Sequence, residues 1–205
     1  MTSSPRQAEE AAPVSTGAAA GPSGIDPDAI PDPVLVDRAA SGDTAAFTIL
    51  ASRHTAVLRG YARRLTGSQA DADDAVQEAL IRAWSTIDTL RDSHAVRSWL
   101  IRIVSRCAVD LIRSRRHHAD LEAVPEPADH RPGPEETAVA LSGREALENA
   151  LKGLPEGQRQ VWILKEIGGL SIAEIAEMTG LPHPTVRGRV DRSRARLMEE
   201  MKEWR

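Results

Sequence analysis

Apolar residues recur at three- and four-residue steps along most of residues 34–117, which is typical of helices with one buried face. Four successive helices are predicted there. The second has the apolar positions Phe47, Leu50, Val57, Leu58, Tyr61 and Leu65. The third and fourth place on one face Val76, Leu80, Ala83 and Ile87, and then Val96, Leu100, Ile103, Cys107 and Leu111. No segment shows a sustained period-two alternation, so strands are not expected.

Turn and capping residues separate these four helices. Asp32-Pro33 begins the first helix and Gly42 ends it, because proline suits a first helical turn and glycine suits a helix end. Asp43 is expected to cap the second helix, which stops at Gly67. The starts of the third and fourth helices are marked by Ser68 with Asp71, and by Ser93.

Residues 138–205 predict four further helical segments. The first spans about 138–152, and the second begins at Pro155 and stops at Gly168-Gly169. The third is short, and the fourth is long and basic and follows it after a turn. Both parts of the chain are therefore expected to be helical.

The last two helical segments follow a distinctive order. Ser171 and Glu174 match a capping box, and Gly180 ends the short helix that they start. Residues 181–184 form the turn, and Thr185 is expected to cap the basic helix. A short capped helix, a tight turn and a longer basic helix form the pattern of a helix-turn-helix.

Two segments lack this periodicity. Residues 1–33 contain six prolines, three glycines and seven alanines, a composition that predicts a disordered N-terminal extension. Residues 118–137 contain four prolines and more acids than bases, which predicts a flexible acidic linker. The expected fold is therefore all-α, with two small helical domains at 34–117 and 138–205.

Composition narrows the class of protein. The chain is 41% hydrophobic but only 3% aromatic, which favours helices over a β-sandwich. Its single cysteine, Cys107, excludes an internal disulfide framework and a cysteine-based zinc site, and fits a cytoplasmic location. No run approaches the length of about 18 apolar residues that a membrane span needs, and the start does not match a secretory signal. No membrane insertion of its own is expected.

The net charge of −4 is unevenly distributed. Residues 34–118 carry 13 arginines against 9 acids, whereas residues 1–33 carry one arginine and five acids. Net acidity therefore does not argue against a nucleic-acid surface on the helical parts of the chain.

The final helix sorts its arginines around an apolar seam of Val186, Val190, Ser193 and Leu197. The first residues of the second helix in a helix-turn-helix meet base edges, and later residues meet phosphates. The candidates for base readout are Thr185, Arg187, Gly188 and Arg189, and those for phosphate contact are Arg192, Arg194 and Arg196. The alternative is a solvated basic face. The helix-turn-helix context favours contact with DNA.

Two further charged sets lie in residues 34–117. Arg102, Arg106 and Arg113 form a stripe with Arg116 nearby, and Asp110 is placed to pair with Arg106 or Arg113. By itself, this stripe favours a solvated helix face over a DNA-binding surface. The second set comprises Asp73, Asp74, Gln77, Glu78 and Arg82. This set lacks the pattern of a calcium-binding loop, so a calcium site is not expected. Two roles stay open: the acids stabilise the helix dipole, or the set forms a protein-docking surface.

Motifs for catalysis are missing from the sequence. It contains no phosphate-binding P-loop, nucleophile elbow or zinc-protease motif, and its six histidines are not spaced as ligands with Cys107. Cys107 is expected to be a buried structural thiol. No enzyme activity, metal or cofactor is predicted.

Taken together, these segments resemble the extracytoplasmic-function sigma factors of bacterial RNA polymerase. DADDAVQEALIRAW at 71–84 and VRSWLIRIVSRCAVDLIRSRR at 96–116 are similar to the family's region 2. The stretch from Leu154 to Leu197 is similar to its region 4. The order of the two motifs across an acidic linker is specific to the family.

The resemblance implies a role for each set of residues. Asp73, Asp74, Gln77, Glu78 and Arg82 match the surface that binds core RNA polymerase. The loop 89–96, with Arg91, Asp92, Ser93 and His94, matches the segment that captures a flipped base of the −10 element. The arginines that match the surface on −10 region DNA are Arg102, Arg106, Arg113, Arg115 and Arg116. The C-terminal helix-turn-helix would read the −35 element of promoter DNA, and an anti-sigma factor is an expected partner.

The predicted function is that of a non-enzymatic alternative sigma factor that recognises −10 and −35 elements. A stand-alone helix-turn-helix regulator is the main competitor, and it leaves the Asp73–Trp84 segment unexplained. An enzyme of nucleic-acid metabolism is a third reading, and it lacks a catalytic constellation.

Overall fold

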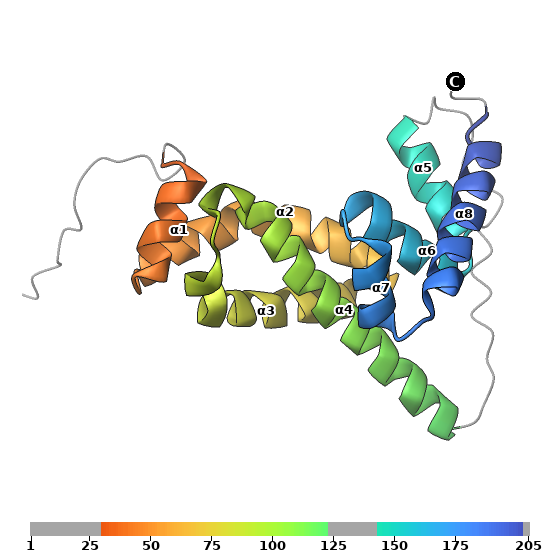
Figure 1. Cartoon of the computed structure of the whole chain (residues 1–205), viewed down its shortest axis with the longest axis horizontal. Helices are drawn as coiled ribbons and strands as arrows, with labels where there is room; N and C mark the ends of the chain where they lie inside the picture. The colour runs from red at the N-terminus through yellow and green to blue at the C-terminus, as the bar shows by residue number, and fades with distance from the viewer. Residues whose placement is uncertain (1–29, 123–142, 203–205) are drawn as a thin grey trace, which may run out of the picture. The chain divides into compact units, whose positions relative to one another are not determined.

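The regular structure is helical throughout the residues that the computed structural model describes, which are 30–122 and 143–202 (Figure 1). This confirms the predicted all-α fold. Residues 1–29 of the predicted disordered extension 1–33, and most of the predicted linker 118–137, lie outside the described residues. At the end of the extension the prediction was wrong, because Asp32 and Pro33 form the start of the first helix.

The first helical group consists of α1 (Asp32–Ala40), α2 (Thr44–Thr66), α3 (Gln69–Thr86) and α4 (Val96–Glu122). Two short 3-10 helices, η2 (Ile87–Thr89) and η3 (Ser93–Ala95), connect α3 to α4. Helices α2, α3 and α4 pack against one another, and α1 covers one end of α2. The fully buried side chains of this core include Leu35, Leu50, Leu58, Leu65, Leu100 and Ile112.

The helix boundaries of this group follow from their caps. The Asp43 carboxylate accepts hydrogen bonds from the backbone N–H groups of Ala45 and Ala46, each at 3.0 Å, so it caps α2 as predicted. Gly67 ends α2 with φ +75°, a conformation that glycine adopts without strain. The Ser68 hydroxyl accepts from the N–H of Asp71 and caps α3.

Three predictions for this group were wrong in detail. Asp92, not Ser93, is the capping residue, because its carboxylate accepts from the N–H of His94 and starts η3, after which α4 begins at Val96. Helix α4 continues to Glu122, five residues into the segment predicted as linker. Val57 was assigned to the apolar face of α2 but is 43% exposed, since it lies at the edge of the arc that α3 and α4 cover.

The second group consists of α5 (Gly143–Lys152), α6 (Glu156–Trp162), the π-helical turn η4 (Ile163–Ile167), α7 (Ile172–Thr179) and α8 (His183–Glu200). Helix α8 packs along α6 and contacts α5 and α7. The core of this second group includes Val161, Ile163, Leu164, Leu170, Ile175 and Val186. A smaller cluster of Ala150, Leu151, Leu154 and Leu197 joins α5 to α8.

The capping box that starts α7 is confirmed. The Ser171 hydroxyl accepts from the N–H of Glu174, and the Glu174 carboxylate accepts from the N–H of Ser171. Helix α8, in contrast, begins at His183 after Pro182, two residues before the predicted cap, Thr185. Pro184 lies in the first helical turn, where backbone N–H groups have no intrahelical acceptor, so the absence of an N–H in proline costs no hydrogen bond. Thr185 is therefore a first-turn residue of α8 rather than its cap.

Candidate nucleic-acid and protein interfaces

Helix α8 presents the predicted seam to the core. Val186, Val190 and Leu197 are buried, and Ser193 is fully buried against α6. The Ser193 hydroxyl lies 3.1 Å from the carbonyl oxygen of Gln158 and 2.8 Å from that of Arg189. A buried hydroxyl needs such a partner, so this contact fixes how α8 lies along α6.

The exposed start of α8 carries part of the predicted base-reading set. Arg187 is exposed, and Thr185 and Gly188 are partly exposed beside it. Arg189 is half-buried, and its guanidinium lies so close to Gly157 of α6 that a Cβ there would be 2.7 Å from Nη1. The structure thus brings three of the four predicted residues to the surface together and holds the fourth against α6.

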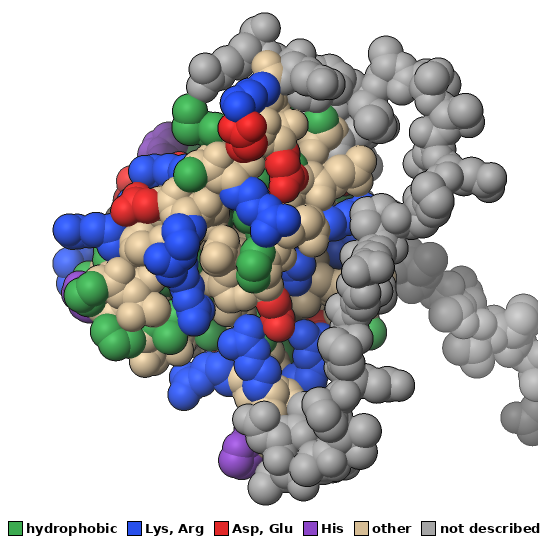
Figure 2. Space-filling model, turned by 90° about the vertical axis from the view of Figure 1, so that its right-hand side faces the viewer, with side chains coloured by type: hydrophobic (Ala, Val, Ile, Leu, Met, Phe, Trp, Pro, Cys, Tyr) green, Lys and Arg blue, Asp and Glu red, His purple; other side chains and the backbone are tan. Residues whose placement is uncertain are grey.

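The three arginines predicted to meet phosphate differ in their surroundings. Arg194 Nη2 lies 2.7 Å from Glu166 Oε1, and Arg196 Nε lies 3.1 Å from Glu200 Oε1. Arg192 is exposed and forms no ion pair within the described part of the chain. Figure 2, which shows the side of α5 and α8, has Lys and Arg side chains spread over this face with Asp and Glu side chains between them. Exposed pairs of this kind are weak and screened by salt, so they do not prevent exchange with phosphate.

An open groove of about 440 Å³ lies between α3 and α4. Its lining residues are Asp74, Gln77, Glu78, Ile81, Arg82, Cys107, Asp110, Leu111 and Ser114. Arg82 donates from Nε to Glu78 Oε1 at 2.7 Å, and this hydrogen bond raises the pKa of Arg82. Cys107 is buried as predicted, and burial raises the pKa of its thiol.

Four of the five residues predicted for protein docking line this groove. The fifth, Asp73, is directed to α2, where its Oδ1 lies 3.0 Å from Nε of Arg59. Asp110 was expected to pair with Arg106 or Arg113, but it faces Arg82 across the groove at 3.9 Å. Sequence reasoning also missed Ile81, which is 59% exposed at this site. A large apolar residue between Glu78 and Arg82, away from the apolar face of α3, was the available signal.

The predicted −10 residues lie in two places. Arg91 is exposed in the loop that joins η2 to η3, and Asp92 caps η3. Ser93 and His94 lie within η3, where His94 is exposed. On α4 all five predicted arginines are exposed, and this set is called the arginine row below. Arg106 and Arg113 form no ion pair among the described residues, whereas Arg102, Arg115 and Arg116 do.

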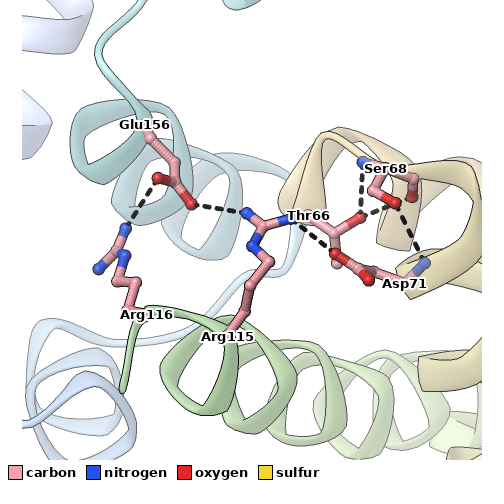
Figure 3. A network of polar contacts seen from close by, with 6 residues as sticks. All are labelled: Thr66, Ser68, Asp71, Arg115, Arg116 and Glu156. Carbon is pink, nitrogen blue, oxygen red and sulfur yellow. Dashed lines mark hydrogen bonds and ion pairs between the residues drawn. The ribbon is translucent and has the colours of Figure 1, made fainter. Parts of the chain in front are cut away.

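The partners of these three arginines come from other helices. Arg102 Nη1 lies 2.7 Å from Glu174 Oε1 of α7. Arg115 contacts Asp71 of α3 at 2.8 Å and Glu156 of α6 at 3.4 Å. Arg116 lies 3.3 Å from the second oxygen of Glu156. Figure 3 draws the contacts of both arginines with this carboxylate. These carboxylate partners were not predicted.

Within the described ranges, no helix is both long and apolar enough to span a membrane. The same residues contain no group of three His, Cys, Asp or Glu side chains placed to hold a metal ion.

Comparison with known families finds two matches that divide the chain as its two helical groups do. The model of sigma-70 region 2 matches residues 50–118, and the model of sigma-70 region 4 matches residues 144–197.

Comparison with characterised proteins gives matches over most of the chain. RNA polymerase sigma factor CnrH of Cupriavidus metallidurans is 35% identical over 175 residues, which cover 81% of this chain and 92% of that protein. ECF RNA polymerase sigma factor SigM of Mycobacterium tuberculosis is 38% identical over 168 residues, 81% of this chain and 82% of that protein. The ECF RNA polymerase sigma-E factor of Escherichia coli is 32% identical, covering 80% of this chain and 90% of that protein.

Two solved structures of sigma factors align with this chain. The structure of CnrH in complex with the cytosolic domain of CnrY is 33% identical and covers 84% of this chain and 97% of that one, with a TM-score of 0.48. The sigma factor RpoE of Bartonella quintana, solved with the anti-sigma factor NepR, is 28% identical over 71% of this chain and 90% of that one, with a TM-score of 0.47. The region matches and the identities to sigma factors over most of their length are decisive: the chain belongs to the extracytoplasmic-function sigma factors, non-enzymatic alternative sigma factors that bind core RNA polymerase and direct promoter-specific transcription.

Proposed function

We propose that the two helical groups of this sigma factor bind different parts of the transcription initiation complex. Residues 34–117 bind core RNA polymerase and the −10 element, and residues 138–205 bind the −35 element. The supporting observation is that each group has an exposed surface suited to its task. The first has the groove between α3 and α4, and the second has the basic start of α8.

Core polymerase is assigned to the groove. Asp74, Gln77, Glu78 and Arg82 supply its polar rim, and Ile81 supplies an exposed apolar anchor. Buried apolar anchors inside a polar rim carry much of the energy of protein interfaces. Asp73 acts from outside the groove by holding Arg59.

Promoter reading at −35 is assigned to the first turns of α8. Arg187 is the base-reading side chain, with Thr185 and Gly188 beside it, and Arg192 meets phosphate. Arg189 has a different role from the one predicted, because its contact with Gly157 makes it a positioning residue between α8 and α6. Arg194 and Arg196 reach phosphate after exchanging their carboxylate partners.

Recognition of the −10 element is assigned to the exposed side chains of Arg91, in the loop before η3, and His94, within η3, and to the arginine row on α4. Arg106 and Arg113 are available for phosphate as they stand. Ser93 and the capping residue Asp92 shape the loop.

We also infer an anti-sigma partner and a cytoplasmic location. CnrH, 33% identical, was solved with the cytosolic domain of CnrY, and RpoE, 28% identical, with the anti-sigma factor NepR. These likenesses support a partner of the same kind, and action with RNA polymerase supports the location.

Run-off transcription with purified core polymerase tests the assignment of the groove. Ile81→Asp should lower the affinity for core and reduce promoter-dependent transcript. Val34→Asp is the matched control, because Val34 is also exposed, at 46%, and lies on α1 outside the groove. Equal losses from both variants would refute the groove as the docking site. Tight, sequence-specific operator binding without polymerase, together with no complex with core, would favour the stand-alone regulator.

A further inference from the structure

Three of the arginines assigned to −10 DNA are already paired with carboxylates from the second helical group or from α3. Arg102 pairs with Glu174 over 72 residues of sequence, and Arg115 and Arg116 share Glu156 of α6 (Figure 3). The two carboxylates thus tie α4 to the helices of the C-terminal group, α6 and α7.

We propose that Glu156 and Glu174 act as an electrostatic latch that occupies the phosphate-binding arginines of α4 and lowers the affinity of the free chain for −10 DNA. The proposal rests on the proposed function of α4. A carboxylate offers an arginine the same paired oxygen acceptors that a phosphate does, so the two anions compete for one guanidinium.

The geometry of Glu156 fits this role. Its Oε1 lies 3.4 Å from Arg115 and its Oε2 lies 3.3 Å from Arg116, so a single carboxylate engages two adjacent arginines. Arg115 also contacts Asp71 at 2.8 Å, which orients its side chain toward Glu156. A phosphate that binds both arginines must therefore displace Glu156.

The second carboxylate, that of Glu174, is oriented by the capping box as well as by Arg102. Glu174 Oε2 accepts from the N–H of Ser171 at 2.8 Å in the capping box, and Oε1 remains for Arg102. The backbone hydrogen bond from Ser171 is the largest cause that lowers the pKa of Glu174, so this carboxylate is ionised at neutral pH. The start of the helix-turn-helix is thereby linked to the arginine row of α4.

The strength of the latch suits a device that opens. The side chains of Arg102, Arg115 and Arg116 are 55%, 49% and 45% exposed, and those of Glu156 and Glu174 are 37% and 35% exposed. Ion pairs this exposed are individually weak and are screened by salt. A run of DNA phosphates offers many anions at once and is able to displace the two carboxylates from the arginines. Binding of core polymerase is able to do the same.

The test compares the full chain with a Glu156→Gln/Glu174→Gln variant, because glutamine keeps the shape and the capping capacity of each side chain. Glu199→Gln is the matched control, since Glu199 pairs with Lys202 near the end of α8 and Lys202 is not among the residues assigned to DNA. Binding of a fluorescent single-stranded −10 oligonucleotide is measured without polymerase, at low and high salt. The radius of gyration is measured by small-angle X-ray scattering.

The double variant should bind the oligonucleotide about two- to tenfold more tightly at low salt, and this gain should shrink at high salt. Its radius of gyration should increase, while Glu199→Gln should match the wild type in both measurements. An unchanged affinity and an unchanged radius would overturn the latch. Run-off transcription with core polymerase separates this failure from a failure of the proposed function, because a latch-free sigma factor still gives promoter-dependent transcript.

Discussion

Tyr61 provides a sharp test of the packing between α2 and α4, because it is the only tyrosine of the chain. It is 2% exposed, and its hydroxyl lies 2.7 Å from the Oγ of Ser105. The Ser105 hydroxyl donates to the carbonyl oxygen of Ile101 at 2.7 Å. Since serine has only one hydroxyl proton, Tyr61 must donate to Ser105. Ionisation of Tyr61 would remove this donor and leave a buried charge.

Burial is the main cause that raises the pKa of Tyr61, from 10.0 to about 12. Below pH 10 both the folded and the unfolded states are protonated, and the stabilisation from this difference is fully present. As the pH rises from 10 toward 12, the unfolded state loses its proton first, so the free energy of unfolding falls. Two pKa units correspond to a loss of about 3 kcal/mol by about pH 12.

Two measurements on the same samples check this expectation. The ultraviolet absorbance of tyrosinate reports the ionisation of Tyr61, and circular dichroism reports whether the protein is still folded. Urea unfolding at neutral pH and at about pH 11 gives the loss of stability. Tyr61→Phe should cost about 1 kcal/mol at neutral pH, through the lost hydrogen bond, and should remove the alkaline loss due to this residue. Ionisation near pH 10 in a protein that remains folded would refute the reasoning, as would the same alkaline loss in Tyr61→Phe.

Four further substitutions test the helix-turn-helix and the core. Arg187→Ala should cost about 1–3 kcal/mol of DNA binding and relax preference at one base pair of the −35 element, whereas Arg194→Ala should weaken all sequences alike; competition binding across −35 variants distinguishes them. Ser193→Ala should lower the free energy of unfolding by about 1 kcal/mol in urea titrations, because the buried hydroxyl that donates to the Arg189 or the Gln158 carbonyl is lost. Leu100→Ala should cost about 2–5 kcal/mol in the same assay, since Leu100 is 1% exposed; a loss below about 1 kcal/mol would contradict its place in the core.

The helices were predictable because their signals are local. An apolar face recurs every three or four residues, and a capping residue acts on N–H groups two or three positions away. Asp43 and the pair Ser171–Glu174 therefore cap their helices as predicted. The start of α8 was missed because Thr185 has a capping side chain, whereas Pro184 is compatible with a first turn but does not mark where that turn begins.

The candidate site was only partly predictable, because its charges are paired across the fold. The arginines of α4 and α8 are evident from composition and spacing. Their partners are not, since Glu166 lies 28 residues from Arg194 and Glu156 lies 41 residues from Arg115. The position of Arg189 over Gly157 likewise depends on how α8 crosses α6. Helical periodicity cannot predict such pairs, because they arise only when helices distant in sequence pack together.

The pairing of these arginines changes how the basic surface should meet DNA. An arginine that is already neutralised by a carboxylate keeps little counterion atmosphere, so its transfer to a phosphate changes the salt dependence of binding less than an unpaired arginine does. Under the proposed function, the arginines that are unpaired among the described residues, Arg187, Arg192, Arg106 and Arg113, would supply the salt-dependent attraction to DNA. Arg102, Arg115, Arg116 and Arg194 would instead exchange a carboxylate for a phosphate. The proposed latch therefore predicts weak DNA binding by the free chain and a smaller salt dependence for the paired arginines than for the unpaired ones.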